Sequence, residues 1–271
     1  MKQLTARETA DVVRRLETER PLGPAFGFVD PATDVRYTFH THQRHQLIVP
    51  RDGVVTVESE HRLLVAGPGQ AVWIPARSRH ATALRAARKA SVFFDARVFA
   101  SIARDVCLFT VPDVVSAMAE HAAALGARVN PGHAFFTALR ALCLQASRAD
   151  EGPSLPRPRS VNLQRAVEAM LARLAQPDLA EVARVAGMSA RSLRRSFRAE
   201  TGLAPRDYLG RARMLWAMQS LAGPRAQSVL EVSLATGFNS PSAFTAAFRR
   251  CFGKSPRELR AAPARPPVTS G

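Results

Sequence analysis

The second half of the chain contains an internal repeat, and this repeat restricts the fold more than any other feature. Leu179–Gly187 (LAEVARVAG) aligns with Val229–Gly237 (VLEVSLATG) at an offset of 50 residues. After the two glycines the offset becomes 51, which aligns Phe197 with Phe248. A fixed period is typical of a duplicated supersecondary unit. The second copy therefore repeats the fold of the first, with one extra residue in its turn.

Each copy carries the signals of a helix–turn–helix. The first helices begin at a short polar cap followed three residues later by glutamate, at Asp178–Glu181 and Ser228–Glu231. A glycine that suits a left-handed helix end follows in both copies, at Gly187 and Gly237. The second helices are started by serine caps, Ser189 and Ser240, the latter followed by proline.

The second helix of the first copy has two faces at the helical period. Leu193 and Phe197 lie on the apolar face, and the other face carries Arg191, Arg194, Arg195 and Arg198 with no acidic residue among them. A solvated charged face is the ordinary interpretation of such a helix. Behind a well-formed turn, however, the arginines favour a helix that reads the major groove, because arginine forks onto guanine edges and clamps phosphates.

The second helix of the second copy is less polar. Phe244, Phe248 and Phe252 form its apolar face, and the opposite face is small and weakly polar. We expect the first helix to specify more of the DNA sequence than the second. The predicted DNA-binding residues are Ser189, Arg191, Arg194, Arg195, Arg198, Asn239, Ser240, Ser242, Thr245, Arg249 and Arg250.

Between the copies, Arg206 to Leu221 predicts a helix of about 16 residues, or ~24 Å. A spacer of this length would set the two reading helices roughly one DNA turn (~34 Å) apart.

The distribution of charge agrees with DNA binding by the second half. Residues 155–271 have 19 basic and 7 acidic side chains, whereas residues 1–154 have 19 basic and 15 acidic ones. The excess in the second half indicates an anionic partner, with nucleic acid first.

The segment from Ser228 to Arg260 resembles the signature of the AraC/XylS family of bacterial transcription regulators, and the resemblance covers 161–262. Its Gly-Phe-x-Ser, Phe-Arg-Arg-x-Phe-Gly and Ser-Pro elements are intact. Leu259 stands where the family usually has an aromatic residue, and Ala246 where a longer polar side chain is common. The resemblance implies two helix–turn–helix units that grip adjacent major grooves of promoter DNA, with RNA polymerase as a further partner.

Short β-type runs punctuated by glycine and proline fill the region from about 25 to 98, which predicts an all-β barrel. The fold class is thus multidomain α+β: a β-barrel of the cupin (jelly-roll) type ahead of an all-α domain. We expect an N-terminal helix in 1–22, the barrel in 23–98, a helical connector in 99–149, a linker in 150–160, the DNA-binding domain in 161–262 and a flexible tail in 263–271.

Three histidines and a glutamine stand at the spacing of the two cupin motifs, which the barrel half resembles. His40 and His42 alternate with one residue between them, Gln46 takes the place of the motif glutamate, and His80 follows Gly69 and Pro75. Arg77 occupies the place of the second motif glycine. In metal-binding cupins the positions matching His40, His42, Gln46 and His80 ligate the ion.

Two interpretations of this motif stay open. Three imidazoles suit one divalent transition metal (Zn, Ni, Cu or Fe), although glutamine is a weaker ligand than glutamate. Alternatively, the barrel binds a small-molecule effector without metal, in a pocket lined by His40, His42, Gln46, Trp73 and His80. We expect His45 to be a surface or rim residue.

The connector carries apolar helical stripes, one through Val114, Val115 and Met118 and one through Phe135, Phe136 and Leu139. They predict either packing under the barrel or the seam of a homodimer, which the family uses. The three cysteines are too few and too widely spaced for a disulfide framework, and we expect Cys107 and Cys143 in the core. With no stretch long enough to span a membrane and no signal-peptide core, we expect a cytoplasmic protein.

These features are compatible with three functions. A sequence-specific DNA-binding transcription regulator with a sensor barrel, and no enzyme activity, is favoured by the two capped reading helices. A metal-dependent cupin enzyme (oxygenase or isomerase) fused to a DNA-binding domain needs an acid or base near the metal, and the motif region offers only Asp52 and Glu58. A non-specific architectural DNA binder is suggested by the charge alone.

Overall fold

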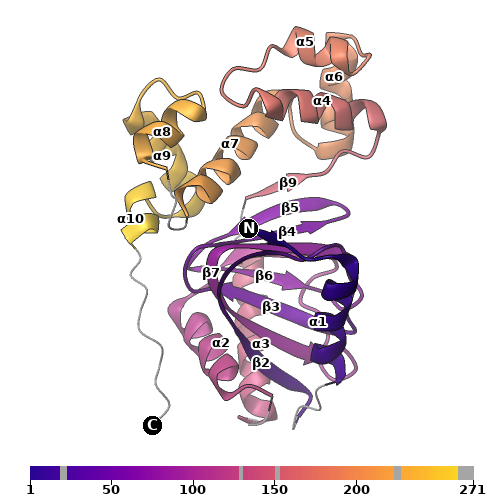
Figure 1. Cartoon of the computed structure of the whole chain (residues 1–271), viewed down its shortest axis with the longest axis vertical. Coiled ribbons are helices and arrows are strands. Elements are labelled where there is room, and N and C mark those ends of the chain that lie inside the picture. The colour runs from indigo at the N-terminus through magenta and orange to yellow at the C-terminus, as the bar shows by residue number, and fades with distance from the viewer. Residues whose placement is uncertain (19–22, 128–130, 150–152, 223–226, 262–271) are drawn as a thin grey trace.

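A computed structural model of the chain describes residues 1–18, 23–127, 131–149, 153–222 and 227–261. It confirms the two-part α+β fold: a nearly closed antiparallel barrel below and a helical domain above (Figure 1). The tail expected in 263–271 lies outside the described residues. None of the described helices is both long and apolar enough to span a membrane.

The barrel is one sheet in the order β8-β6-β3-β7-β4-β5-β9, with β2 on β7 and the short β1 parallel to β2. Its strands are β1 (Lys2–Gln3), β2 (Ala25–Arg36), β3 (Arg44–Pro50), β4 (Val54–Ser59), β5 (Arg62–Ala66), β6 (Gln70–Ile74), β7 (His80–Asp95), β8 (Cys107–Thr110) and β9 (Ser154–Pro156). The long β7 pairs with three strands and closes the barrel.

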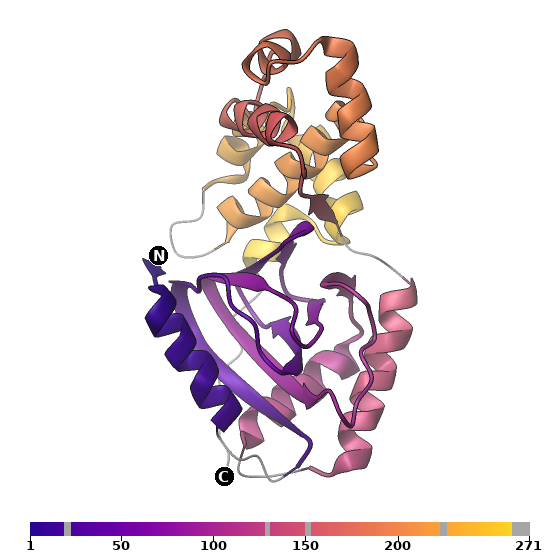
Figure 2. The same ribbon diagram turned by 90° about the vertical axis from the view of Figure 1, so that its right-hand side faces the viewer.

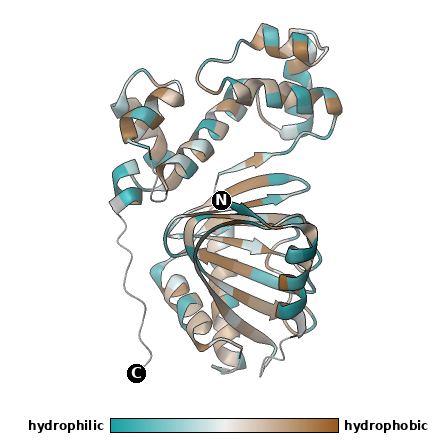
Figure 3. Cartoon of the chain, in the orientation of Figure 1, coloured by the Kyte–Doolittle hydropathy of each residue, from teal (hydrophilic) through white to brown (hydrophobic). Residues whose placement is uncertain are grey.

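Alternation along each strand separates the lumen from the outer face. In β3, Ile48 packs into the lumen with β4, β5 and β6, whereas Leu47 and Val49 face outward. The outward residues are covered by α2 (Asp113–Leu125) and α3 (His133–Ala149), while α1 (Ala6–Thr18) lies along another side of the barrel (Figure 2). The strands carry long apolar stretches, whereas hydrophilic residues dominate the visible side of α1 (Figure 3).

The connector is used to pack the barrel. Val115 and Ala119 of α2 and Phe136, Leu139 and Cys143 of α3 are buried in the same core as β3 and β6. The apolar stripes are therefore largely consumed within the chain, and a homodimer stays a prediction. Burial raises the pKa of the Cys143 thiol to about 12, which fits a core residue.

The boundaries differ from expectation in two places. The sheet continues beyond residue 98, because β8 from the connector pairs with β6. The linker expected in 150–160 is also partly structured: Ser154–Pro156 forms β9 on the open edge of β5, with Leu155 opposite Leu63. The proline-rich, polar composition indicated only a linker, because the free strand edge that receives Ser154–Pro156 is a tertiary feature.

The helical domain is built around α7 (Pro205–Leu221), on which both repeat units pack. The first unit contains α4 (Val161–Ala172), α5 (Leu179–Val185) and α6 (Ala190–Thr201); the second contains α8 (Val229–Ala235), α9 (Pro241–Phe252) and α10 (Pro256–Ala261). The sequence repeat is thus confirmed as two helix–turn–helix units.

The helical domain sits on the outer face of the barrel. Leu155, Val54 and Val65 belong to the same hydrophobic core as Met214, Leu215 and Met218 of α7. Polar contacts surround this core: Gln219 donates to the hydroxyl of Thr56 at 2.9 Å, Tyr208 to the carbonyl of Pro156 at 3.0 Å, and Lys254 to the carbonyl of Pro68 at 3.3 Å.

Leu155→Ala should lower the free energy of unfolding by about 2 kcal/mol or more, because a leucine that is 4% exposed leaves a cavity between the two domains. Urea unfolding of the full chain would measure the loss. The matched control is Leu171→Ala on α4, where the side chain is 36% exposed and a change below about 0.5 kcal/mol is expected. Equal effects of the two substitutions would contradict this account of the domain contact.

Candidate functional sites in the barrel and the helical domain

His40 and His80 face each other across a two-residue antiparallel bridge. The backbone N–H of each donates to the carbonyl of the other, at 2.8 and 2.9 Å. Directly opposed residues in an antiparallel pair place their side chains on the same side. The two imidazole rings consequently meet, with centroids 4.3 Å apart.

His42 is held beside them by the turn that precedes β7. The backbone N–H of Arg77 donates to the carbonyl of His42 at 2.8 Å, and the Arg77 guanidinium donates to the side chain of Gln43 at 3.0 Å. Arg77 has a left-handed φ of 63°, at the position where the cupin motif has glycine. A left-handed φ is the conformation that glycine adopts without strain, so Arg77 takes up here a backbone conformation that suits the motif residue it replaces.

The same backbone contact orients all three imidazoles. The Nδ1 of His40, His42 and His80 lies 2.7–2.9 Å from the carbonyl oxygens of Thr38, Arg44 and Ser78 respectively. A carbonyl only accepts, so Nδ1 is the protonated nitrogen in each ring and Nε2 of a neutral ring carries a free lone pair. This is the arrangement found behind metal-ligating histidines.

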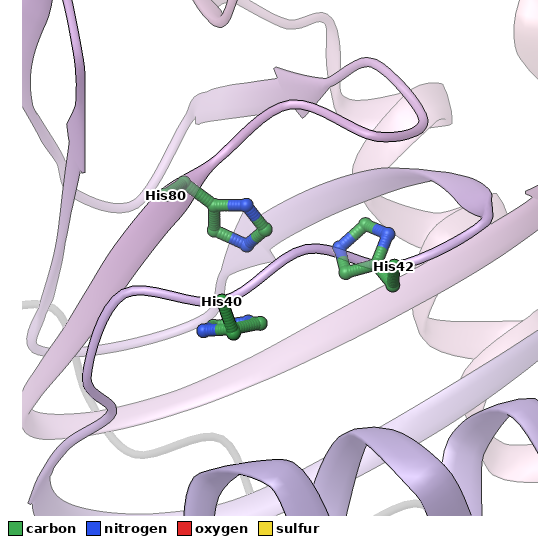
Figure 4. Close-up of side chains that lie close together, drawn as sticks. All are labelled: His40, His42 and His80. Atoms are coloured by element: carbon green, nitrogen blue, oxygen red, sulfur yellow. The ribbon is translucent and has the colours of Figure 1, made fainter. Parts of the chain in front are cut away.

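One nitrogen of each ring lies within 4.8 Å of those of the others, so the three histidines converge (Figure 4). The Nε2 of His80 is buried and has no hydrogen-bond partner among the described residues. Burial is the main cause that lowers the pKa of His40, and it holds the pKa of His80 well below its ordinary value. Both rings are therefore neutral at pH 7, the form that can bind a metal.

Gln46 joins the cluster from β3. Its Oε1 lies 3.1 Å from the Nε2 of His42, and its amide nitrogen donates to the hydroxyl of Ser91 at 3.2 Å. A positive charge also lies next to the cluster, because the buried ammonium group of Lys89 donates to the same hydroxyl of Ser91 at 2.8 Å. This charge would compete with a bound cation, and the sequence motif did not indicate it.

His40, His42 and Gln46 line a cavity of about 50 Å³ at the mouth of the barrel, and His80 is buried beside them. Helix α1 covers this mouth with Val12, Val13 and Leu16. Sequence reasoning missed these residues, because helical periodicity shows that α1 has an apolar face but not what that face covers. The usual small-molecule pocket is about 300–1,000 Å³, so the cavity accommodates an ion with a few waters and not a typical organic effector.

Two of the predictions about the barrel are wrong in position. Trp73 does not line the cavity: it is opposite Leu47 in the β3–β6 pair, faces the α2–α3 side and donates to the hydroxyl of Ser101 at 3.0 Å. His45 is not a rim residue, since it is 6% exposed, stacks on Trp73 and accepts from the Ala76 N–H at 2.8 Å. Both positions follow from the alternation of side chains along a strand. His45 is next to Gln46 in β3, and Trp73 is next to Ile74, the residue that pairs with Gln46, so both point to the opposite face of the sheet from Gln46.

In the helical domain, α6 presents the basic surface that the sequence predicts. Ser189 caps the helix by accepting from the Ser192 N–H, and Leu193 and Phe197 are buried. The exposed face carries Arg191, Arg194, Arg195 and Arg198, none of which has an ion pair within the described chain. The acidic residue near the end of α6, Glu200, is occupied: it accepts from the Ser160 hydroxyl and N–H and from the Arg159 N–H at the start of α4.

The corresponding face of α9 is more neutral. Ser240 caps the helix by accepting from Ala243, and Asn239, Ser242 and Arg250 are exposed while Thr245 is half-buried. Arg249 is 3.6 Å from Glu258, so part of its charge is neutralised.

The capping boxes at the starts of α5 and α8 also differ. Ser228 and Glu231 form a complete capping box, whereas Glu181 does not reach the cap at Asp178 and pairs with Arg184.

Comparison with known proteins places both halves. Residues 24–154 match the model of the AraC-like ligand binding domain, and residues 182–262 match that of a helix-turn-helix domain. The HTH-type transcriptional activator RhaS of Enterobacter sp. (strain 638) is 39% identical over 79 residues, and RhaS of Klebsiella pneumoniae (strain 342) is 38% identical over 80. These matches cover 29% and 30% of this chain and 28% of each relative, so the likeness is to about a quarter of their length.

Solved structures give weaker likenesses. An AraC-type DNA-binding domain protein from Chromobacterium violaceum is 34% identical, with a TM-score of 0.36 over 39% of this chain and 94% of that one. ToxT from Vibrio cholerae, solved with an unsaturated fatty acid, is 9% identical, with a TM-score of 0.37 over 87% of this chain and 94% of that one.

The two domain matches follow one another along the chain and together cover most of it, in the same order as the barrel and the helical domain. The chain belongs to the AraC family of transcription regulators, with an AraC-like ligand-binding domain ahead of its helix-turn-helix domain.

Proposed function

We propose that this protein is a sequence-specific DNA-binding transcription regulator whose barrel binds a divalent transition metal and thereby alters promoter binding. The observation that supports DNA binding most is the exposed face of α6, where four arginines stand without a neutralising acid in the described chain. Unpaired arginines on a helix behind a helix–turn–helix turn are suited to guanine edges and phosphates. The relatives named transcriptional activators agree with a role at promoters.

The metal is the signal that best fits the barrel. The residues that would hold it are His40, His42 and His80, with Gln46 as a weaker fourth ligand. Three imidazoles suit Zn, Ni, Cu or Fe, and the small cavity admits an ion more readily than an organic molecule. Lys89 opposes the binding of a cation; its ammonium group would pair with an anionic ligand that completes the metal's coordination.

The enzyme alternative finds no support in the placement of its acids. Asp52 is held by Arg88, and Glu58 lies between Arg36 and Arg157 on the outer face of the barrel. Among the described residues that line the histidine cavity there is no carboxylate to act as acid or base. A role in regulation needs only that occupancy of the barrel and DNA binding are coupled, and the shared core around Leu155 and α7 offers a physical connection.

Arg194→Ala should weaken binding to a specific operator by ~1–3 kcal/mol, if this side chain reads a base. Titration of labelled duplex DNA with the full-length protein would measure it, on the operator and on random DNA in parallel. Arg148→Ala on α3 is the charge-matched control, since it removes an exposed arginine from the barrel half. An equal loss on both DNAs would instead assign Arg194 to a phosphate.

The purified protein should bind one equivalent of transition metal, and a chelator should change its affinity for the operator. Elemental analysis and a DNA-binding assay with and without the chelator would test both. His80→Ala should weaken metal binding by at least about 100-fold, since even outer-shell partners are worth 10- to 100-fold. His61→Ala, an exposed histidine outside the cluster, should leave it unchanged. If the affinity for the operator is the same with metal, without metal and with chelator, the metal is not the signal that the barrel senses.

The ring nitrogens offer a test that needs no metal. In the metal-free protein at pH 7, His80 should be protonated on Nδ1, because that nitrogen donates to the carbonyl of Ser78 at 2.9 Å. Nitrogen-15 NMR distinguishes the two tautomers of each histidine. A proton on the Nε2 of His80 would contradict the geometry from which the metal site is inferred.

A further inference from the structure

The two turn glycines of the repeat have the same backbone but different surroundings. Gly187 and Gly237 have φ values of 65° and 74°, the left-handed region in which glycine is unstrained. A Cβ atom added at Gly187 would meet nothing within 4 Å. One added at Gly237 would lie 2.2 Å from the carbonyl oxygen of Ala175 and 3.0 Å from the Nη2 of Arg213. Gly237 thus serves a contact that Gly187 does not.

This contact joins the two repeat units directly. Ala175 lies between α4 and α5 of the first unit, whereas Gly237 lies in the turn between α8 and α9 of the second. The close approach places the carbonyl of one unit against the backbone of the other at a position where no side chain larger than hydrogen fits. The absence of a Cβ is what allows the units to touch here.

Arg213 of α7 holds the carbonyl in place. Its Nε donates to the carbonyl of Leu174 at 3.0 Å, and its Nη2 donates to that of Ala175 at 2.5 Å. These carbonyls belong to the segment that follows the C-terminal end of α4. A planar guanidinium with two fixed N–H vectors determines direction as well as distance, which the single ammonium group of lysine does not.

The consequence concerns the two reading helices. Both units pack on α7 in one hydrophobic core. Leu174, Ala175, Arg213 and Gly237, here called the inter-unit clamp, add a second point of attachment away from the apolar face of α7. Two points of attachment fix the rotation of one unit relative to the other.

We propose that the inter-unit clamp fixes the spacing and rotation of α6 relative to α9, so that the protein requires a two-part DNA site with a set number of base pairs between its halves. This rests on the proposed function, since both helices must contact DNA. The clamp residues are positioning residues that do not themselves reach the duplex.

The test compares DNA spacing preferences of full-length proteins. A duplex recovered from a randomised library with the wild-type protein serves as operator, and two derivatives have one base pair added or removed between the recognised blocks. For wild type, the change of one base pair should weaken binding by about tenfold or more, comparable to a mismatched base pair. For Arg213→Ala the same change should cost less than about threefold.

Two matched variants come from the chain itself. Arg211→Ala removes an arginine from the same helix that donates to Ser154 of β9 instead, and it should keep the wild-type spacing penalty. Gly187→Ala and Gly237→Ala introduce the same left-handed alanine, but only at Gly237 does the added Cβ meet the carbonyl of Ala175. Gly237→Ala should therefore lower the melting temperature more than Gly187→Ala does, and it alone should weaken the spacing penalty.

Each outcome has a distinct meaning. If folded Arg213→Ala and Gly237→Ala proteins keep the full spacing penalty, the clamp proposal is overturned. If Arg213→Ala does not fold, Arg213→Lys, which keeps the charge but not the fork, should show an intermediate penalty, and a wild-type penalty would overturn the proposal. If the wild-type protein shows no sequence preference at all, the proposed function itself fails.

Discussion

The packing of α7 on the outer face of the barrel is the contact on which the arrangement of the rest of the molecule depends. The apolar side of α7 shares one core with β4, β5 and β9 on one side and with both helix–turn–helix units on the other. This helix is therefore the physical connection through which occupancy of the barrel would act on the DNA-binding units in the proposed function. The short strand β9 completes the contact by adding Leu155 to the core and the carbonyl of Pro156 to Tyr208.

The histidine cluster shows which parts of a binding site a sequence motif predicts and which it does not. The spacing of His40, His42, Gln46 and His80 predicts that they converge, and the structure brings them together. The motif contains no information about Lys89 or the cover formed by α1, because these come from strand register and helix docking. Trp73 was assigned to the wrong face because closeness to the motif in sequence does not decide which side of the sheet a residue faces. Successive side chains of β6 point to opposite faces, and Trp73 pairs with Leu47 and not with Gln46.

The repeat carries a second lesson. Its caps, turns and helix lengths were readable from local signals, since a serine cap or a glycine helix end acts within a few residues. The asymmetry between the copies was only partly readable. The arginines of α6 and the small residues of α9 are visible in the sequence, but the different tasks of Gly187 and Gly237 depend on Ala175, more than 60 residues before Gly237.

The sequence by itself determined the two-domain α+β fold, the duplicated helix–turn–helix, the basic second half and the set of converging histidines. Each of these follows from periodicity, local turn chemistry or charge, which act over short stretches of chain. Only the tertiary structure decided that Ser154–Pro156 of the linker pairs with β5 and that α2 and α3 pack under the barrel. It also decided that α1 covers the cavity lined by His40 and His42, and that Arg213 contacts the segment between α4 and α5. These features arise where segments distant in the sequence come into contact. Each contact depends on the shape and polarity of both surfaces, so neither segment alone predicts it.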